Sequence, residues 1–240
     1  MKTLITGGCS FSDGGNPITW PYRLAASNLL LDYKHIGTGV LAQGNGLISR
    51  KIIYTVSELL KTTYPEDILV GIMWSGPNRH DFYLEDVKFS KDIIEGWLQN
   101  PTCFIPHSKN NWVFIVPSWR NEFVKSYYST FYSHIGSLIY TYEHILRVQW
   151  FLKLHNIKYF MSSFTNEVFP VEICHRDVQH LYNQIDFYNF LPVSSEDDWC
   201  RKYSGIPYLD PNDQHHPSFD HHQAFTDQII IPFLQDKKYI

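Results

Sequence analysis

The alternation of short apolar runs with amphipathic stretches predicts a chain in which β-strands are separated by α-helices. Residues 2–6 form a β-prone run that ends at a glycine pair, and residues 33–36 form a second short run. Residues 67–74 (DILVGIMW) are almost continuously apolar, which is typical of a strand buried on both faces. Residues 158–164 predict a further strand. Strands that alternate with helices favour a parallel sheet with helices on both faces.

Helical spacing of the apolar positions predicts the elements between these strands. The first helix is expected over residues 20–31 and the second over about residues 45–62. A long helix is expected over roughly residues 124–155. The final helix is expected over residues 219–234, where Pro232 should end it. The predicted fold class is therefore α/β, with a central parallel sheet inside a three-layer α/β/α sandwich.

The region from about residue 80 to residue 120 does not continue this pattern. It mixes short aromatic runs with an asparagine pair and three prolines, and we interpret it as an insertion that carries a small hairpin. With 240 residues, of which 44% are hydrophobic, the chain can bury a sizeable core. We therefore expect one domain over residues 1–240 that includes this insertion.

Charge and apolar patterning restrict the classes of partner. The formal net charge is -4, so there is no basic surface of the kind that attracts nucleic acid. No signal peptide and no transmembrane stretch is apparent, which favours a cytoplasmic protein. The cysteines are widely spaced and are expected to be free thiols: Cys9, Cys103, Cys174 and Cys200.

Polar residues follow several of the predicted strands. In open α/β sheets, sites form at the carboxyl ends of the strands, so these residues are expected to converge. They are Ser10 in GGCSFSDGG, Gly44 in AQGNG, Asn78 in WSGPNR, and Asp213 with His216 in DPNDQHHPS. Each alone has a structural interpretation as a turn or cap residue. Their joint order along the chain favours one site.

In this order the chain resembles the SGNH or GDSL hydrolase family. The matching segments are GCSF at residues 8–11, GN at 44–45, GPN at 76–78 and DQHHP at 213–217. The resemblance spans nearly the whole chain and implies a flavodoxin-like SGNH hydrolase fold. Two positions depart from the family pattern, because Cys9 and Arg79 stand where the family commonly has aspartate. These two neighbours line the expected pocket and leave the substrate class open.

The residue types suit acyl transfer through a serine ester. A hydroxyl is a weak nucleophile until an imidazole removes its proton, and the imidazole needs a carboxylate to fix its tautomer. Ser10, His216 and Asp213 supply these groups. The resemblance assigns the oxyanion donors to the backbone N–H groups of Ser10 and Gly44 and to the Asn78 side chain. We expect a cofactor-independent hydrolase of a short-chain acyl or O-acetyl ester, with a carbohydrate ester among the candidates.

Other sites could be built from the same segments. Histidines and aspartates crowd residues 210–222 and could bind a metal ion, but their spacing matches no familiar zinc pattern. His221 and His222 should begin the last helix, with one of them facing solvent. A Cys9 nucleophile is a further alternative, although a side chain at that position should point away from the site. We therefore expect no metal ligands.

Two other functions remain open from sequence. An acyltransferase would form the same acyl-enzyme and pass the acyl group to an alcohol. A catalytically inactive carbohydrate-binding module on this fold would use the aromatic residues of the insertion. The presence of Ser, Asn, Asp and His together favours an enzyme. The sequence does not determine the oligomeric state.

Overall fold

A four-stranded parallel sheet forms the centre of the protein. The computed structural model describes residues 1–13, 16–83, 112–118, 122–170, 175–207 and 216–240. The strand order is β2-β1-β3-β6. The strands are β1 (Lys2–Gly7), β2 (Tyr33–Gly37), β3 (Ile68–Trp74) and β6 (Lys158–Ser163). The prediction of a central parallel sheet in an α/β fold is confirmed.

The apolar run of β3 has the central position that its composition predicts. Every residue of β3 is buried, and the strand pairs in parallel with both β1 and β6. A strand covered on both faces gains from apolar residues at successive positions, which explains the lack of alternation. The edge strand β2 pairs with β1 and has no fully buried residue.

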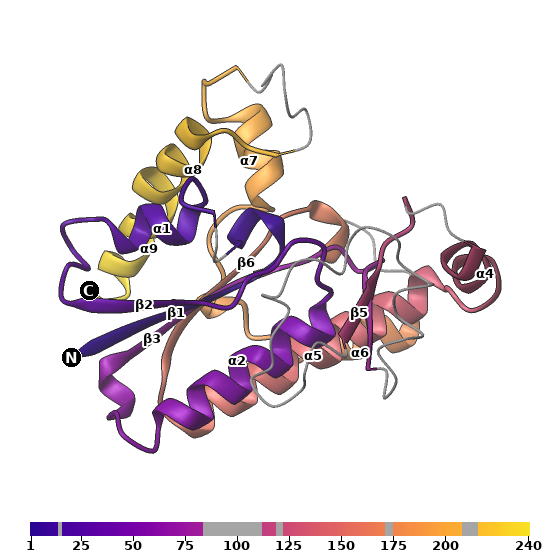
Figure 1. Cartoon of the computed structure of the whole chain (residues 1–240), viewed down its shortest axis with the longest axis horizontal. Coiled ribbons are helices and arrows are strands. Elements are labelled where there is room, and N and C mark those ends of the chain that lie inside the picture. Colours follow the sequence, from indigo (N-terminus) through magenta and orange to yellow (C-terminus); the bar gives the residue numbers. More distant parts are fainter. Residues whose placement is uncertain (14–15, 84–111, 119–121, 171–174, 208–215) are drawn as a thin grey trace.

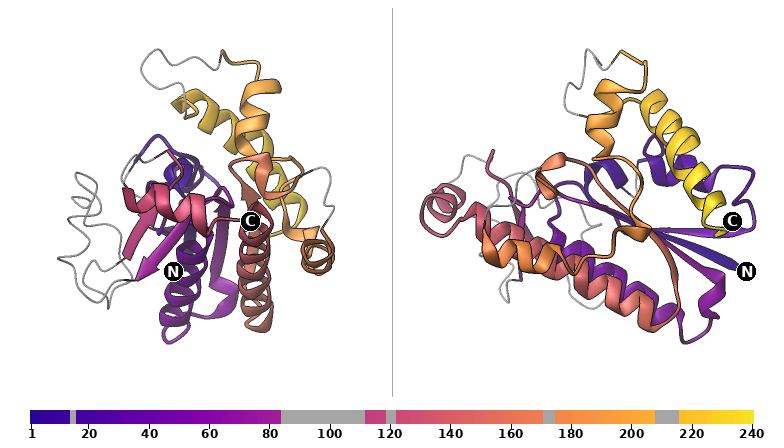
Figure 2. Two further views of the ribbon diagram at one scale, coloured as in Figure 1. Left: turned by 90° about the vertical axis from the view of Figure 1, so that its right-hand side faces the viewer. Right: turned by 180° about the vertical axis from the view of Figure 1, so that it is seen from behind.

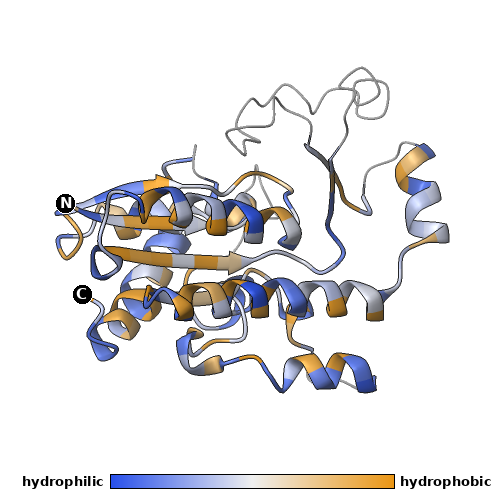
Figure 3. Ribbon diagram, turned by 90° about the horizontal axis from the view of Figure 1, so that it is seen from below, coloured by the Kyte–Doolittle hydropathy of each residue, from blue (hydrophilic) through white to orange (hydrophobic). Residues whose placement is uncertain are grey.

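Helices cover both faces of the sheet (Figures 1 and 2). On one face lie α2 (Asn45–Leu59) and α5 (His134–Leu154), which pack against each other. On the other face lie α1 (Trp20–Ala25), α8 (Phe219–Phe225) and α9 (Ile231–Asp236). Hydrophobic and hydrophilic residues alternate along these ribbons, as expected for helices that bury one side (Figure 3).

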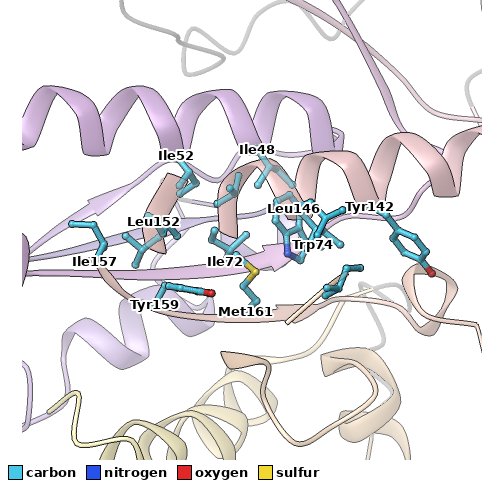
Figure 4. Packing of buried hydrophobic residues seen from close by; sticks show 14 of the residues in the cluster. Ile48, Ile52, Ile72, Trp74, Tyr142, Leu146, Leu152, Ile157, Tyr159 and Met161 are labelled. Carbon is cyan, nitrogen blue, oxygen red and sulfur yellow. The ribbon is translucent and has the colours of Figure 1, made fainter. Parts of the chain in front are cut away.

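A hydrophobic core fills the space between the sheet and the pair α2 and α5. Figure 4 shows Ile48 and Ile52 of α2 facing Ile72 and Trp74 of β3, with Leu146 of α5 beside them. All five side chains are almost completely buried. A second core lies on the opposite face under α1 and α8. The sheet is therefore fixed from both sides, which holds the ends of its strands in place.

The remaining elements lie outside these layers. Strands β4 (His80–Tyr83) and β5 (Trp112–Ile115) form an antiparallel pair, in agreement with the hairpin expected in this region. Three further helices are α4 (Glu122–Thr130), α6 (Arg176–Tyr182) and α7 (Glu196–Lys202). Short 3₁₀ turns are formed by η1 (Ser10–Ser12), η2 (Pro65–Asp67), η3 (Asn166–Val168) and η4 (Phe187–Asn189).

Two predicted helices are interrupted or shorter in the structure. The expected helix over residues 124–155 divides into α4 and α5, because the Ser133 hydroxyl accepts a hydrogen bond from the Gly136 N–H and caps α5. The first helix ends at Ala25 and not near residue 31. Its end is followed by a turn in which the Leu30 N–H donates to the Ser27 carbonyl.

The last helical stretch ends at Asp236, two residues beyond the predicted end, and Pro232 does not stop it as expected. Residues Thr226–Ile230 form a π-helical segment (η5) between α8 and α9. The Ile231 N–H donates to the Thr226 carbonyl, one residue farther back than in an α-helix. This wider turn accommodates Pro232, which has no N–H to donate and would crowd a regular α-helical turn.

Candidate active site

The turn after β1 presents Ser10 at the carboxyl end of the sheet. Ser10 is half-buried and begins the short turn η1. A Cβ atom at Gly8 would lie 2.4 Å from the Ser12 Oγ and 2.8 Å from the Met73 carbonyl oxygen, so only glycine fits there. The Ser12 hydroxyl in turn accepts a hydrogen bond of 2.7 Å from the buried Trp20 indole. Local packing therefore fixes the conformation that presents Ser10.

His216 meets Ser10 from the opposite end of the chain. The His216 Nε2 lies 2.9 Å from the Ser10 Oγ, although the two residues are 206 positions apart. This is the hydrogen bond expected between a serine nucleophile and its general base. The Phe11 ring centroid lies 5.4 Å from that of His216 and supports the imidazole on one side. Asp213, which was expected to orient this ring, lies outside the described residues.

Asn78 lies in the same cavity, after the neighbouring strand β3. A hollow of about 410 Å³ is lined by Ser10, Asn78 and His216 together. Within the described part of the chain, the Asn78 carboxamide makes no hydrogen bond, and the loop is held instead by its backbone. The Tyr128 hydroxyl donates to the Asn78 carbonyl oxygen at 2.5 Å. The Asn78 side chain can therefore serve a ligand without being needed to hold the turn.

Gly44 is not brought to this cavity. Its N–H donates to the Asp81 Oδ1 at 2.9 Å, and the Leu47 N–H donates to the Asp81 Oδ2 at the same distance. The Asp81 carboxylate thus caps the first turn of α2, and burial raises the pKa of this carboxyl. Because the Gly44 N–H already donates to the Asp81 carboxylate, it is not available for the oxyanion role expected of it.

Ala42 occupies the place beside Ser10 that was expected for Gly44. Leu41 and Ala42 line the hollow that contains Ser10 and Asn78. Ala42 has a φ of 64°, in the left-handed region that costs a non-glycine residue about 1–2 kcal/mol. Its N–H donates to no other described residue. Such backbone strain at a cavity wall is typical of functional sites. The sequence does not reveal it, because an alanine gives no indication of a positive φ.

Asn45, next to Gly44, has a structural role. Its buried carboxamide donates to the Ser75 carbonyl oxygen at 2.9 Å and accepts from the Ser75 N–H at 2.7 Å. It also donates to the Thr141 hydroxyl at 3.1 Å. These bonds tie the loop after β2 to the end of β3 and to α5. Asn45 therefore fixes the relative positions of the loops that carry Ala42 and Asn78.

A second hollow opens on the other side of Ser10 and His216. It has a volume of about 520 Å³, and its wall includes Thr19, which directly precedes α1, and Phe219, the first residue of α8. Volumes of this size are typical of small-molecule sites. Because Ser10 and His216 line both hollows, a molecule held at the Ser10 hydroxyl has room to extend in two directions.

The structure bears on the other sites considered from sequence. Cys9 is completely buried, as expected for a side chain that points away from the cavity. Among the described residues, no group of three metal-ligating side chains converges. The expectation that His221 or His222 faces solvent is wrong, because both are buried. The His222 Nδ1 lies 2.7 Å from the Glu196 Oε1, a buried pair that joins α8 to α7.

Comparison of the chain with family models, with curated proteins and with solved structures found no match. Across the described residues, no helix is long and apolar enough to span a membrane.

Proposed function

We propose that this protein is a serine ester hydrolase of the SGNH type. The observation that carries the proposal is the 2.9 Å contact between the Ser10 Oγ and the His216 Nε2. A hydroxyl and an imidazole from opposite ends of a chain meet at the carboxyl edge of a parallel sheet, next to a cavity that also contains Asn78. The proposal includes Asp213 as the carboxylate that orients His216.

The strand order supports the finer assignment of the fold. From β1 the chain moves to β2 on one side, and then returns to β3 on the other side of β1. In open α/β sheets, ligands bind at the point where the strand order reverses. Ser10 follows β1 and Asn78 follows β3, so both lie at this point. This arrangement agrees with the flavodoxin-like sheet that the family resemblance implies.

The geometry supports a two-step reaction. In the first step, His216 accepts the Ser10 hydroxyl proton through Nε2 while the Ser10 Oγ bonds to the ester carbonyl carbon. The resulting tetrahedral oxyanion accepts hydrogen bonds from the Asn78 carboxamide and from the backbone N–H groups of Ser10 and Ala42. The intermediate then collapses, the bond to the alcohol oxygen breaks, and His216 gives its proton to the departing alcohol.

The second step releases the acyl group to water. His216 accepts a proton from a water molecule whose oxygen bonds to the acyl carbon. Collapse of the second tetrahedral intermediate breaks the bond to the Ser10 Oγ, which takes the proton back from His216. The products are a carboxylic acid and the free enzyme. The proposed substrates are short-chain acyl or O-acetyl esters, because each hollow is large enough for a small substituent.

The test is the hydrolysis of para-nitrophenyl acetate by the wild-type protein and by Ser10→Ala. We expect turnover by the wild type and a loss of at least about 1000-fold in kcat for the variant. Ser129→Ala is the matched control, because Ser129 is exposed on α4. This variant should keep the wild-type rate. Equal rates for wild type and Ser10→Ala would refute the proposal.

A further inference from the structure

Arg79 gives the hollow beside Asn78 a positive charge. It follows Asn78 directly and lines the hollow together with Ser10 and His216, and its guanidinium lies over the ring of Phe164, which lines the same hollow. We propose that the ester substrate carries an anionic group, such as a carboxylate, sulfate or phosphate, and that Arg79 binds this group. The inference rests on the proposed esterase function and narrows its substrate class.

Aromatic packing holds the Arg79 side chain near the reaction site. The guanidinium carbon lies 4.7 Å from the centroid of the Phe164 ring. The Phe164 centroid is 4.8 Å from that of Phe11, and the Phe11 centroid is 5.4 Å from that of His216. A planar guanidinium on an aromatic face keeps its N–H donors at its edge, where they can bind an oxyanion in a fork geometry. Among the described residues, aromatic rings and not a carboxylate therefore position the cation.

The charge of Arg79 is not neutralised by the described part of the chain. No described carboxylate forms an ion pair with its guanidinium. The Nη1 atom is shielded from solvent and has no hydrogen-bond acceptor within the described residues. A shielded cationic donor without an acceptor is costly, and an anionic oxygen would remove this cost. Within the described residues, therefore, no anion balances the charge of Arg79, and a bound anion would do so.

Glu167 is the opposing charge on the wall of the hollow. It lies on the turn η3, and its side chain is exposed to solvent. Solvent screens an exposed carboxylate more strongly than a shielded guanidinium. Arg79 should therefore dominate the local field. Removal of Glu167 should strengthen the binding of an anion and not weaken it.

The experiment uses matched pairs of esters that differ in one charge. The first pair is mono-para-nitrophenyl adipate and its methyl ester, which place the charge on the acyl side. The second pair is para-acetoxybenzoate and its methyl ester, which place it on the alcohol side. For each pair, the ratio of kcat/KM for the anionic ester to that for the neutral ester is measured. A ratio above one in either pair shows which part of the ester reaches Arg79.

For the wild type, we expect a ratio of about ten to one hundred in one pair, because a hydrogen bond to a charged group typically strengthens binding by such a factor. In Arg79→Gln this ratio should fall to about one, and in Arg79→Glu below one. Arg79→Lys should keep part of the preference, and Glu167→Gln should keep or increase it. Because each result is a ratio within one variant, a general loss of activity does not affect it.

Two results would overturn the inference while leaving the esterase intact. One is hydrolysis of the neutral esters with no preference for either anionic ester. The other is a preference that persists unchanged in Arg79→Gln. If the folded wild type hydrolyses none of the four esters, and para-nitrophenyl acetate is also untouched, the proposed esterase function fails as well.

Discussion

Replacement of Asn78 by alanine should slow catalysis without unfolding the protein. Asn78 lines the cavity together with Ser10 and His216, and its carboxamide makes no hydrogen bond to another described residue. The loop is held by the Tyr128 hydroxyl, which donates to the Asn78 backbone carbonyl and remains in the variant. Stability should therefore fall by less than about 1 kcal/mol, as for other substitutions outside a core or a hydrogen-bond network.

The catalytic effect should be much larger than the effect on stability. A donor that binds the developing oxyanion acts more strongly in the transition state than on the ground-state carbonyl. Loss of one such donor costs about 2.7–4 kcal/mol, or about 100- to 1000-fold in kcat. In Asn78→Ala, kcat for para-nitrophenyl acetate should fall by this factor while KM changes little. Thermal unfolding measured on the same samples should show nearly the wild-type midpoint.

Asn78→Asp is the matched variant for this experiment. It keeps the size of the side chain and removes the N–H donors, so it should lose as much activity as Asn78→Ala. If Asn78 only shaped the turn, Asn78→Asp would remain active and Asn78→Ala would melt early. An early-melting Asn78→Ala with nearly normal turnover would refute the oxyanion assignment.

Three other perturbations test neighbouring parts of the account. A Cβ atom at Gly76 would lie 3.0 Å from the Asn78 Oδ1, so Gly76→Ala should displace the carboxamide and lower kcat by about tenfold at unchanged KM; an unaffected kcat would contradict the placement. Burial, with Arg147 and Arg50 nearby, lowers the pKa of His144 to about 4 from 6.5. The unfolded chain therefore takes up the proton first, and the free energy of unfolding in urea should fall by up to about 2 kcal/mol between about pH 7 and about pH 5. His144→Gln should remove this part of the pH dependence, and an equal fall in the variant would exclude His144 as its source. Dialysis against EDTA should leave ester hydrolysis unchanged, whereas a loss restored by zinc or manganese would favour a metal site.

The parts of the fold that sequence predicts well are those where one local pattern decides the outcome. The continuous apolar run of residues 68–74 requires a strand that is buried on both faces, and this strand is paired on both sides in the middle of the sheet. The periodic apolar positions of α2 likewise require one buried face. Ser10, His216 and Asn78 were identified by the order of their motifs, and the structure brings all three to one cavity.

Other features depend on contacts between distant residues, which a local pattern does not contain. His222 is buried because Glu196 supplies an acceptor from another helix, so its place near the start of α8 did not expose it. The Gly44 N–H is taken by the Asp81 carboxylate of the hairpin, which no spacing near Gly44 reveals. Pro232 was expected to end a helix, but the π-helical turn before it leaves room for the proline within the helix. For His222 and Gly44 a contact with a distant residue overrides the local rule, whereas for Pro232 the wider hydrogen-bonding pattern of the helix itself does so.

Labelling with a fluorophosphonate tests the central claim most directly, because this reagent phosphonylates only a serine that a neighbouring base activates. After treatment of the folded protein, peptide mass mapping should place the label on Ser10 of GGCSFSDGG, and His216→Gln should reduce the labelling rate by at least about 100-fold. Ser129→Ala should label like the wild type. A folded wild-type protein that takes up no label, or one labelled at another serine, would contradict the assignment of Ser10 and His216 as nucleophile and base.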